Sequence, residues 1–119
     1  MEEKNLNIVK LFLIKAKESN ILELDENEFR ENFFNFKNFE NYEEYLTNYV
    51  IDENNICLKF EKELNDLIVN NQIQRYKNYI YIYNMDTNIN IADKDSEIVN
   101  SMIFDYIKLN MGKQKVKVG

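Results

Sequence analysis

Apolar residues recur along much of this chain at intervals of three and four, the spacing that places side chains on one face of a helix. In residues 56–71 the apolar face consists of Cys57, Phe60, Leu64, Leu67 and Ile68. The other positions predict a solvent-facing side made of Lys59, Lys62, Glu63, Asp66 and Asn70. We expect the helix to end at Asn70 and Asn71, because asparagine tolerates the left-handed conformation of a C-terminal cap.

The period changes directly after this helix. Isoleucines at 80 and 82 alternate with Tyr79, Tyr81 and Tyr83, which is typical of a strand with one aliphatic and one tyrosine face. Residues 73–76 are the natural partner strand. The two strands would be joined by a tight turn at Lys77 and Asn78, in which we expect Asn78 to take the positive φ angle.

Upstream, a first helix is predicted over residues 3–18, followed by a connector or short strand at residues 21–24. A second helix is expected from Asp25, which can act as its N-cap with Glu28 three residues further on. Its apolar face carries Phe29, Phe33 and Phe36, and it should end near residues 37–38.

Asn41 is expected to cap a third helix, in which Tyr42, Tyr45, Leu46 and Tyr49 share one face. A polar break at residues 52–55 separates it from the helix of residues 56–71. After the hairpin, residues 84–94 read as a polar loop. Asp95 or Ser96 should then begin a last helix that ends at Gly112, with an inner side of Ile98, Met102, Ile103, Tyr106 and Leu109.

The predicted fold class is therefore α+β and mostly α, in one domain over residues 1–111 with a basic tail at 112–119. The formal net charge is −6, and the surplus of acid lies in residues 1–60. No apolar run approaches membrane-spanning length, and the acidic N-terminus is unlike a secretory signal. The lone Cys57 reads as a small buried hydrophobe. These features favour a cytoplasmic protein.

Catalytic and cofactor chemistry find little support. The chain has no histidine, so the commonest general base and metal ligand is missing, and its glycines, Gly112 and Gly119, cannot form a phosphate-binding loop. Asp86, Asn88, Asn90 and Glu97 match positions of a calcium-binding loop, but Ile91 replaces its required glycine. We predict a self-bonded Asn/Asp turn there, and no enzyme, cofactor, metal or small-molecule substrate.

The order of elements resembles a winged-helix domain over residues 6–83. Residues 21–24 would be its first strand, residues 56–71 its recognition helix, and residues 73–83 its wing. In DNA-binding members that helix enters the major groove and presents basic side chains. Here Lys59 and Lys62 stand among Glu61, Glu63 and Asp66, and winged helices that bind proteins show the same loss of basic surface.

The resemblance and the acidity together predict a non-enzymatic interaction module: a subunit, adaptor or inhibitor of a larger bacterial or phage protein complex, with a defence complex as one such target. The partner would be another protein, and a homodimer is also compatible. Exposed aromatics beside acids would make the contact, at Phe34, Glu40, Glu43, Glu44, Tyr45, Tyr79 and Tyr81.

The alternative is a winged-helix transcriptional regulator that binds DNA. Its phosphate contacts would come from Lys59, Lys62, Arg75 and Lys77, with the tail lysines at 113, 115 and 117 as additions. DNA is the less favoured partner, because an acidic surface repels phosphates.

Overall fold

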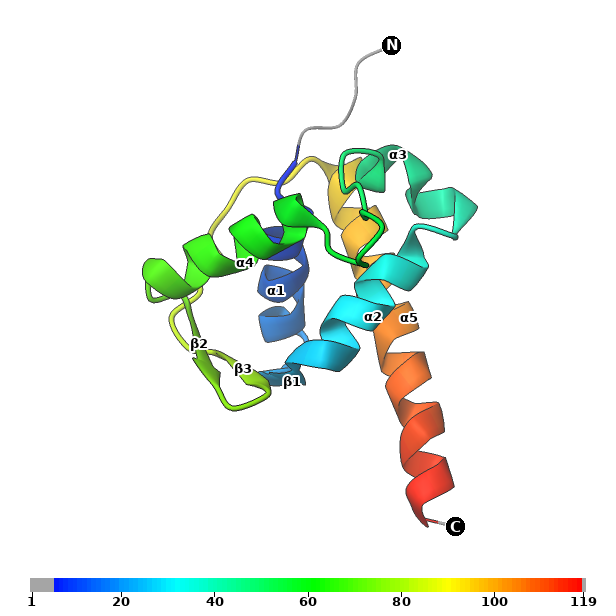
Figure 1. Cartoon of the computed structure of the whole chain (residues 1–119). Helices are drawn as coiled ribbons and strands as arrows, with labels where there is room; N and C mark the ends of the chain where they lie inside the picture. The colour runs from blue at the N-terminus through cyan, green and yellow to red at the C-terminus, as the bar shows by residue number, and fades with distance from the viewer. Residues whose placement is uncertain (1–5, 119) are drawn as a thin grey trace.

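The computed structural model describes the backbone of residues 6–118 and the side chains of residues 6–109. The fold is α+β and mostly helical, as predicted (Figure 1). The elements, in order, are α1 (Ile8–Glu18), β1 (Glu23–Asp25), α2 (Glu26–Phe36), a 3-10 turn η1 (Glu40–Tyr42), α3 (Glu43–Leu46), α4 (Leu58–Val69), β2 (Ile73–Tyr76), β3 (Tyr79–Ile82) and α5 (Asp93–Val118).

Local capping sets the first two helices. The Asn7 side chain accepts a hydrogen bond from the N–H of Lys10, so α1 begins at Ile8 and not at the predicted Glu3, which lies outside the described residues. Asn20 has a φ of 64° just after the helix. The Asp25 carboxylate accepts from the N–H of Glu28 at 3.0 Å, which confirms the predicted cap of α2.

The third predicted helix is shorter than expected and begins differently. Asn41 lies inside η1, and the N-cap of α3 is Tyr42, so the assignment of Asn41 as a cap is wrong. The pattern behind the prediction nevertheless holds, because Tyr42, Tyr45, Leu46 and Tyr49 are all buried. These large side chains are placed by packing rather than by a capping signal.

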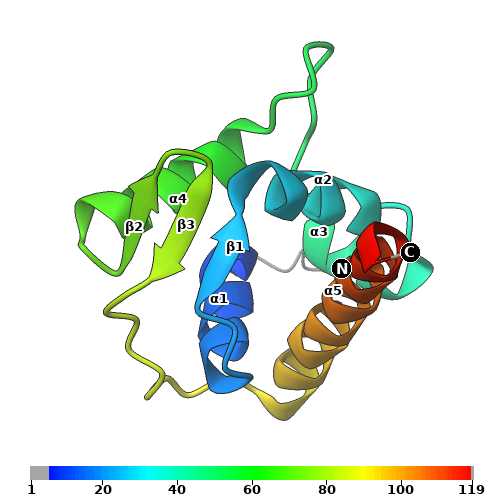
Figure 2. The ribbon, with the colours of Figure 1, turned by 90° about the horizontal axis from the view of Figure 1, so that it is seen from below.

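A polar loop separates α3 from α4, as predicted, and it projects from the body in Figure 2. The loop is held by Asp52, whose carboxylate accepts from the N–H groups of Asn54 and Ile56. Asn55 takes a φ of 62° at its tip. The loop is therefore ordered by its own hydrogen bonds rather than by burial.

Among the described residues, three strands form an antiparallel sheet in the order β1-β3-β2. Leu24 lies opposite Ile80 in the register between β1 and β3, and Ile73 lies opposite Ile82 between β2 and β3. These four side chains are buried and form the inner face of the sheet. The alternation predicted for Tyr79 to Tyr83 is confirmed, since the isoleucines of β3 are buried and Tyr79 and Tyr83 are exposed.

The hairpin turn differs from the prediction in one respect. Lys77, not Asn78, takes the positive φ, at 56°. The carbonyl of Asn78 instead accepts a 2.7 Å hydrogen bond from the N–H of Glu26, the first residue of α2. This tertiary bond fixes the orientation of the turn, and a lysine without a β-branch can adopt the left-handed conformation beside it.

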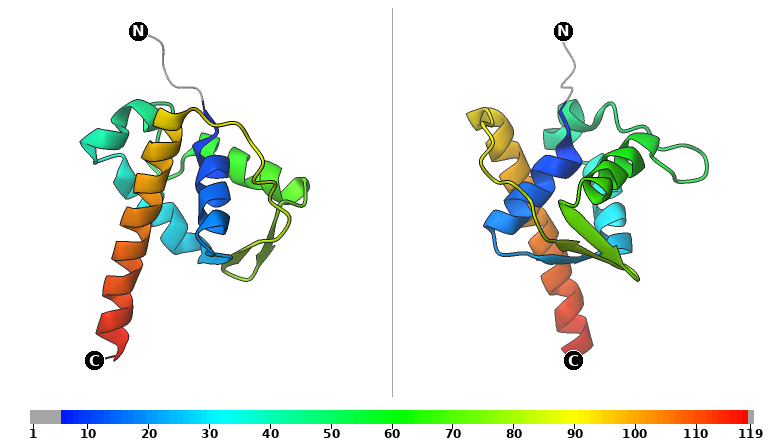
Figure 3. Two further views of the ribbon diagram at one scale, coloured as in Figure 1. Left: turned by 180° about the vertical axis from the view of Figure 1, so that it is seen from behind. Right: turned by 90° about the vertical axis from the view of Figure 1, so that its left-hand side faces the viewer.

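Helix α1 runs through the centre of the core, where it packs against α4 and α5 (Figures 2 and 3). Its Phe12 ring lies 5.1 Å from that of Phe29 in α2 and 5.6 Å from that of Tyr106 in α5. Phe60 of α4 continues the cluster, 5.3 Å from Phe29 and 4.9 Å from Phe33. These rings join four helices into one core.

Helix α4 agrees with its predicted bounds within two residues at each end. Asn71 has a φ of 62°, and the N–H of Gln72 bonds the carbonyl of Leu67, which confirms the asparagine cap. Cys57 is fully buried, as expected. Glu63, however, is buried rather than solvent-facing, because it accepts a hydrogen bond from Tyr49 and pairs with Lys59.

Helix α5 departs most from the prediction. It begins at Asp93, ahead of the predicted caps, and continues past Gly112 to Val118, so the predicted end at Gly112 is wrong. Its last turns extend beyond the body (Figures 1 and 3). Leu109 is 42% exposed rather than inward, because α5 has passed the edge of the body at that turn. Val99, near the start of α5, is fully buried. The boundary between a 1–111 domain and a 112–119 tail stays a prediction.

Two leucines of α4 provide a matched test of this core. Leu64 is fully buried, whereas Leu58 is 74% exposed on the same helix. We expect Leu64→Ala to lower the free energy of unfolding by about 2–5 kcal/mol, because it leaves a cavity. Leu58→Ala should stay within about 0.5 kcal/mol. Urea denaturation at neutral pH measures both, and equal effects would show that α4 buries a different face.

Candidate functional site

The three tyrosines between α2 and α4 are structural rather than exposed. Tyr42 donates its hydroxyl to Asp105 at 2.6 Å, and Tyr45 donates to Asp95 at 2.8 Å, both on α5. Tyr49 donates to Glu63 on α4. Because Tyr45 is only 2% exposed, its prediction as a partner-binding residue is wrong. The ring fills the core, and the hydroxyl is satisfied by a carboxylate that is distant in sequence.

These pairs shift the tyrosine pKa values upward. Burial, and then the hydrogen bond to Asp105, raise the pKa of Tyr42 to about 12. Burial and the bonds to Asp95 and Glu63 likewise raise the pKa values of Tyr45 and Tyr49. Both effects oppose formation of a phenolate, since the apolar surroundings and the nearby carboxylate disfavour a second negative charge.

Among the other residues predicted as partner contacts between positions 34 and 44, the acidic side chains are exposed but the aromatic ring is half-buried. Phe34 is half-buried, with its ring 6.0 Å from that of Phe60. Its remaining surface lines a hollow between α2 and the loop residue Asn55. Glu40, Glu43 and Glu44 are exposed, as expected of a solvated turn. This segment therefore offers acids beside a half-buried Phe34 and a Phe39 that is 38% exposed.

The hairpin retains its predicted exposed tyrosines. Tyr79 is 42% exposed, Tyr81 is half-buried, and their ring centroids lie 6.5 Å apart. Tyr76 and Tyr83 are 63% and 67% exposed and lie on the same outer face of the sheet. The register adds acids to this face, because Glu23 lies opposite Tyr81 and Asp25 lies opposite Tyr79. We call these six residues the tyrosine face.

The sequence pattern pointed to Tyr79 and Tyr81 but not to Tyr76, Glu23 and Asp25 as members of this surface. The signal was present in the alternation of the hairpin and the apolar Leu24. Pairing residues 21–24 with the tyrosine strand would have placed the two acids on the outer side. That step needs the register of strands distant in sequence, which the local pattern does not supply.

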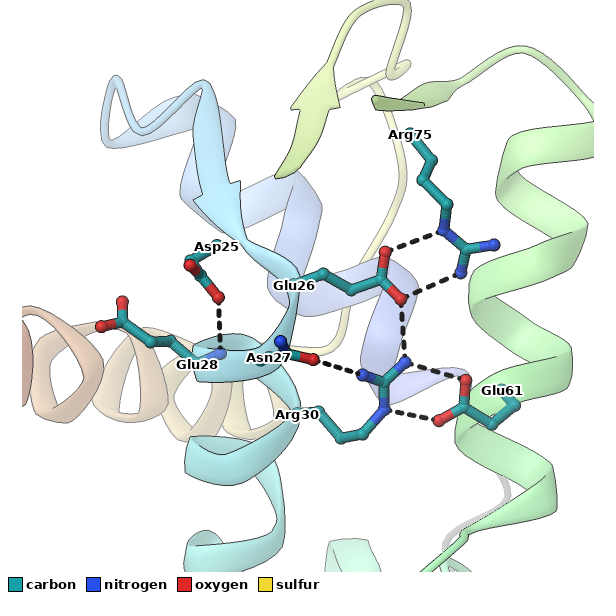
Figure 4. Close-up of polar contacts among 7 residues, drawn as sticks. All are labelled: Asp25, Glu26, Asn27, Glu28, Arg30, Glu61 and Arg75. Carbon is teal, nitrogen blue, oxygen red and sulfur yellow. Dashed lines mark hydrogen bonds and ion pairs between the residues drawn. The ribbon is translucent and has the colours of Figure 1, made fainter. Parts of the chain in front are cut away.

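Two of the four main cations proposed for nucleic acid, Arg75 and Lys59, are engaged in internal ion pairs. The chain has only two arginines, Arg30 and Arg75. Arg75 donates to both oxygens of Glu26, at 2.8 and 3.1 Å, and Arg30 donates to Glu26 at 2.9 Å and to both oxygens of Glu61 (Figure 4). Burial would raise the pKa of Glu26, but the bonds from Arg75 and Arg30 outweigh it and lower that pKa.

The lysines show the same tendency. Lys59 pairs with Glu63 at 2.8 Å and lies 5.0 Å from the centre of the Tyr49 ring. Lys77 lies 5.5 Å from the centre of the Tyr76 ring, and Lys62 is exposed. The side chains of Lys113, Lys115 and Lys117 lie outside the described residues. Among the described side chains, Lys59, Lys62, Arg75 and Lys77 do not form one uncompensated patch.

The loop of residues 84–92 contains the predicted self-bonded turn, in which the Asp86 carboxylate accepts from the N–H of Asn88 at 2.9 Å. Within the described side chains no three Cys, Asp or Glu residues group closely enough to hold a metal ion. No helix in the described part of the chain combines the length and apolar character needed to cross a membrane.

Comparison with protein-family models, with curated proteins and with solved structures gave no match for this chain.

The buried tyrosine–carboxylate pairs predict a loss of stability at high pH. The folded pKa of Tyr42 lies above the unfolded value of about 10, so its contribution is complete below pH 10 and is lost as pH rises toward 12. Tyr42→Phe should cost about 0.5–1.5 kcal/mol at pH 7 and flatten the decline above pH 10. Denaturant unfolding at pH 7, 10 and 11 tests this.

Tyr83→Phe is the control at pH 7, since it removes a hydroxyl that is exposed at the end of β3, and should stay within about 0.5 kcal/mol. The pairing of Tyr42 with Asp105 is contradicted if Tyr42→Phe keeps the full alkaline decline.

The arginine network gives a second stability test. Glu26→Gln leaves the guanidiniums of Arg30 and Arg75 facing a neutral amide. We expect a loss of about 1–3 kcal/mol at pH 7. Glu31→Gln, an exposed substitution on the same helix, should stay within about 0.5 kcal/mol. Thermal unfolding monitored by circular dichroism compares them, and matched midpoints would mean that the network adds no stability.

Proposed function

We propose that this chain is a winged-helix-like, non-enzymatic protein-interaction module that acts as a subunit, adaptor or inhibitor of a larger protein complex. The tyrosine face of its sheet would make the contact. A cytoplasmic location and an association with bacterial or phage machinery, including that of defence, are part of this proposal.

Two features support the winged-helix-like description. Strand β1 follows α1 and pairs with β3, the second strand of the hairpin that follows α4. The hairpin is anchored to α2 through Asn78 and Arg75, and so it stands as a fixed wing beside α4. Both agree with the element order that carried the resemblance, and α5 closes the domain.

The observation that carries the functional proposal is the uncovered tyrosine face. Tyr76, Tyr79 and Tyr83 are each at least 42% exposed on one side of a sheet whose other side buries Leu24, Ile73, Ile80 and Ile82 in the core. Tyrosine is enriched in the energetic centres of protein interfaces, because its ring buries much apolar area while its hydroxyl tolerates water. A hollow between the end of α4 and β2 is partly lined by Tyr76 and Tyr81, so this surface is concave at its β2 edge.

The state of the cations favours a protein over DNA. Arg75 and Lys59 were two of the four residues assigned to phosphate contacts, and both are paired with carboxylates. Breaking such pairs to bind phosphate would remove one cation from each of the largely buried carboxylates of Glu26 and Glu63, which costs free energy. Glu23 and Asp25 also place negative charge on the hairpin side of the molecule.

The proposal is tested by capturing partners with the tagged full-length protein from nuclease-treated lysate of the source organism. We expect a stoichiometric protein partner, and its loss by about tenfold or more with the double variant Tyr79→Ser/Tyr81→Ser. Phe104→Ser is the matched control, because Phe104 is 62% exposed on α5, away from the sheet.

Circular dichroism of each variant checks that the fold is retained. Recovery of nucleic acid with the loss of every co-eluting protein after digestion would instead support the DNA-binding alternative. A partner retained equally by both variants would place the interface elsewhere on the molecule.

A further inference from the structure

Five of the six residues of the tyrosine face, together with Gln74, form two rows that cross the sheet. The first row runs from Glu23 through Tyr81 to Gln74, and the second from Asp25 through Tyr79 to Tyr76. Side chains directly opposite in antiparallel strands share a face and lie close together. Each row therefore begins with a carboxylate on β1 and continues with an aromatic ring on β3.

The chemistry of these rows favours positive charge. The faces of tyrosine rings carry negative electrostatic potential, and a cation above such a ring is attracted to it. Tyr76 already holds the ammonium group of Lys77 in this manner, 5.5 Å from the ring centre. Arg75, the other cation of the hairpin, lies on the opposite side of the sheet and is bound by Glu26. The tyrosine face thus combines acids and ring faces.

Both acids interact with neighbours within the rows. Desolvation, followed by the interaction with the Glu23 carboxylate that lies opposite on β1, raises the pKa of Tyr81. One carboxylate oxygen of Asp25 accepts a hydrogen bond from the N–H of Glu28, which fixes the side chain at the start of α2. In the second row a partner's cation would therefore meet an Asp25 carboxylate that is ordered before it arrives, and such preorganisation lowers the entropic cost of binding.

We propose that the tyrosine face binds an extended segment of a partner protein that carries arginine or lysine at alternate positions. This inference rests on the proposed function and specifies the class of partner. The rings of Tyr79 and Tyr81 lie 6.5 Å apart, which matches the roughly 6.6–6.8 Å between alternate residues of an extended chain. Each cation of the segment would lie over one row, between its ring and its carboxylate.

Charge complementarity decides between this occupant and others. A phosphate backbone would meet Glu23 and Asp25 unfavourably. A second copy of this acidic chain would bring its own carboxylates to the same place. A cationic segment is attracted by every acidic or aromatic member of the two rows. Lys77, which lies beside the rows at the hairpin tip, is repelled by it.

The test titrates the isotopically labelled full-length protein with short peptides and follows its amide resonances. The probes are an Arg-Ser alternating peptide, the same peptide with Lys or Glu in place of Arg, and one with arginines three residues apart. We expect saturable shifts confined to residues 23–25 and 74–83 with the Arg and Lys alternating peptides. The three-residue spacing should bind more weakly, and the Glu peptide should not bind.

Variants identify the groups responsible. Tyr79→Leu/Tyr81→Leu should weaken binding about tenfold, whereas Tyr79→Phe/Tyr81→Phe should retain most of it, because phenylalanine keeps the aromatic face. Glu23→Gln/Asp25→Asn should also weaken binding and reduce its salt dependence. Asparagine at position 25 preserves the cap of α2. Phe104→Ser is again the control and should change nothing.

The inference is overturned if the Arg peptide causes no localised shifts at millimolar concentration, or if the Glu peptide binds equally well. It is also overturned if the same resonances shift on self-association or with oligothymidine in place of the peptide. A natural partner that is lost with Tyr79→Ser/Tyr81→Ser but kept with Glu23→Gln/Asp25→Asn would contradict the cationic segment alone. The proposed interaction function would survive that result.

Discussion

Glu26 connects the β2–β3 hairpin to the helices of this molecule. Its backbone N–H bonds the carbonyl of Asn78 at the hairpin tip, and its carboxylate takes hydrogen bonds from Arg75 of β2 and Arg30 of α2. Arg30 in turn holds Glu61 of α4. A two-stranded hairpin is marginally stable alone in water, so these tertiary bonds and the pairing with β1 keep the sheet at a fixed angle to the helices. The side chains on the outer surface of the sheet are therefore held in a fixed position relative to the helices.

Six of the eight tyrosines of the chain fall into two groups that differ in what surrounds the hydroxyl. Tyr42, Tyr45 and Tyr49 lie in the core, and each has a carboxylate from another helix as its acceptor. In the hairpin, Tyr76, Tyr79 and Tyr83 keep much of their surface in solvent. Burial of a tyrosine requires a hydrogen-bond partner for its hydroxyl, and the distant acids of α4 and α5 supply it. The acidic character of the chain is thus partly a requirement of its core.

Local signals predicted most of the fold. The Asp25 cap, the Asn71 helix end and the alternation of β3 each depend on residues close together in sequence, and all three are present. The errors concern long-range partners. Tyr45 was assigned to the surface because its acceptor, Asp95, lies far along the chain, and Glu63 was placed in solvent because its bond to Tyr49 could not be foreseen. The surface beside the hairpin was incomplete for the same reason, since β1 completes it.

The short strand β1 also bears on when that surface comes into existence. Glu23 pairs with Tyr81 only after the intervening α2, α3 and α4 have been arranged, because closing a long loop before its contacts form is entropically unfavourable. The β2–β3 hairpin can form early from neighbouring residues, but the acid-to-tyrosine rows are assembled late in folding. A partner that recognises those rows would therefore distinguish the native chain from partly folded forms, and its binding would stabilise the native state by mass action.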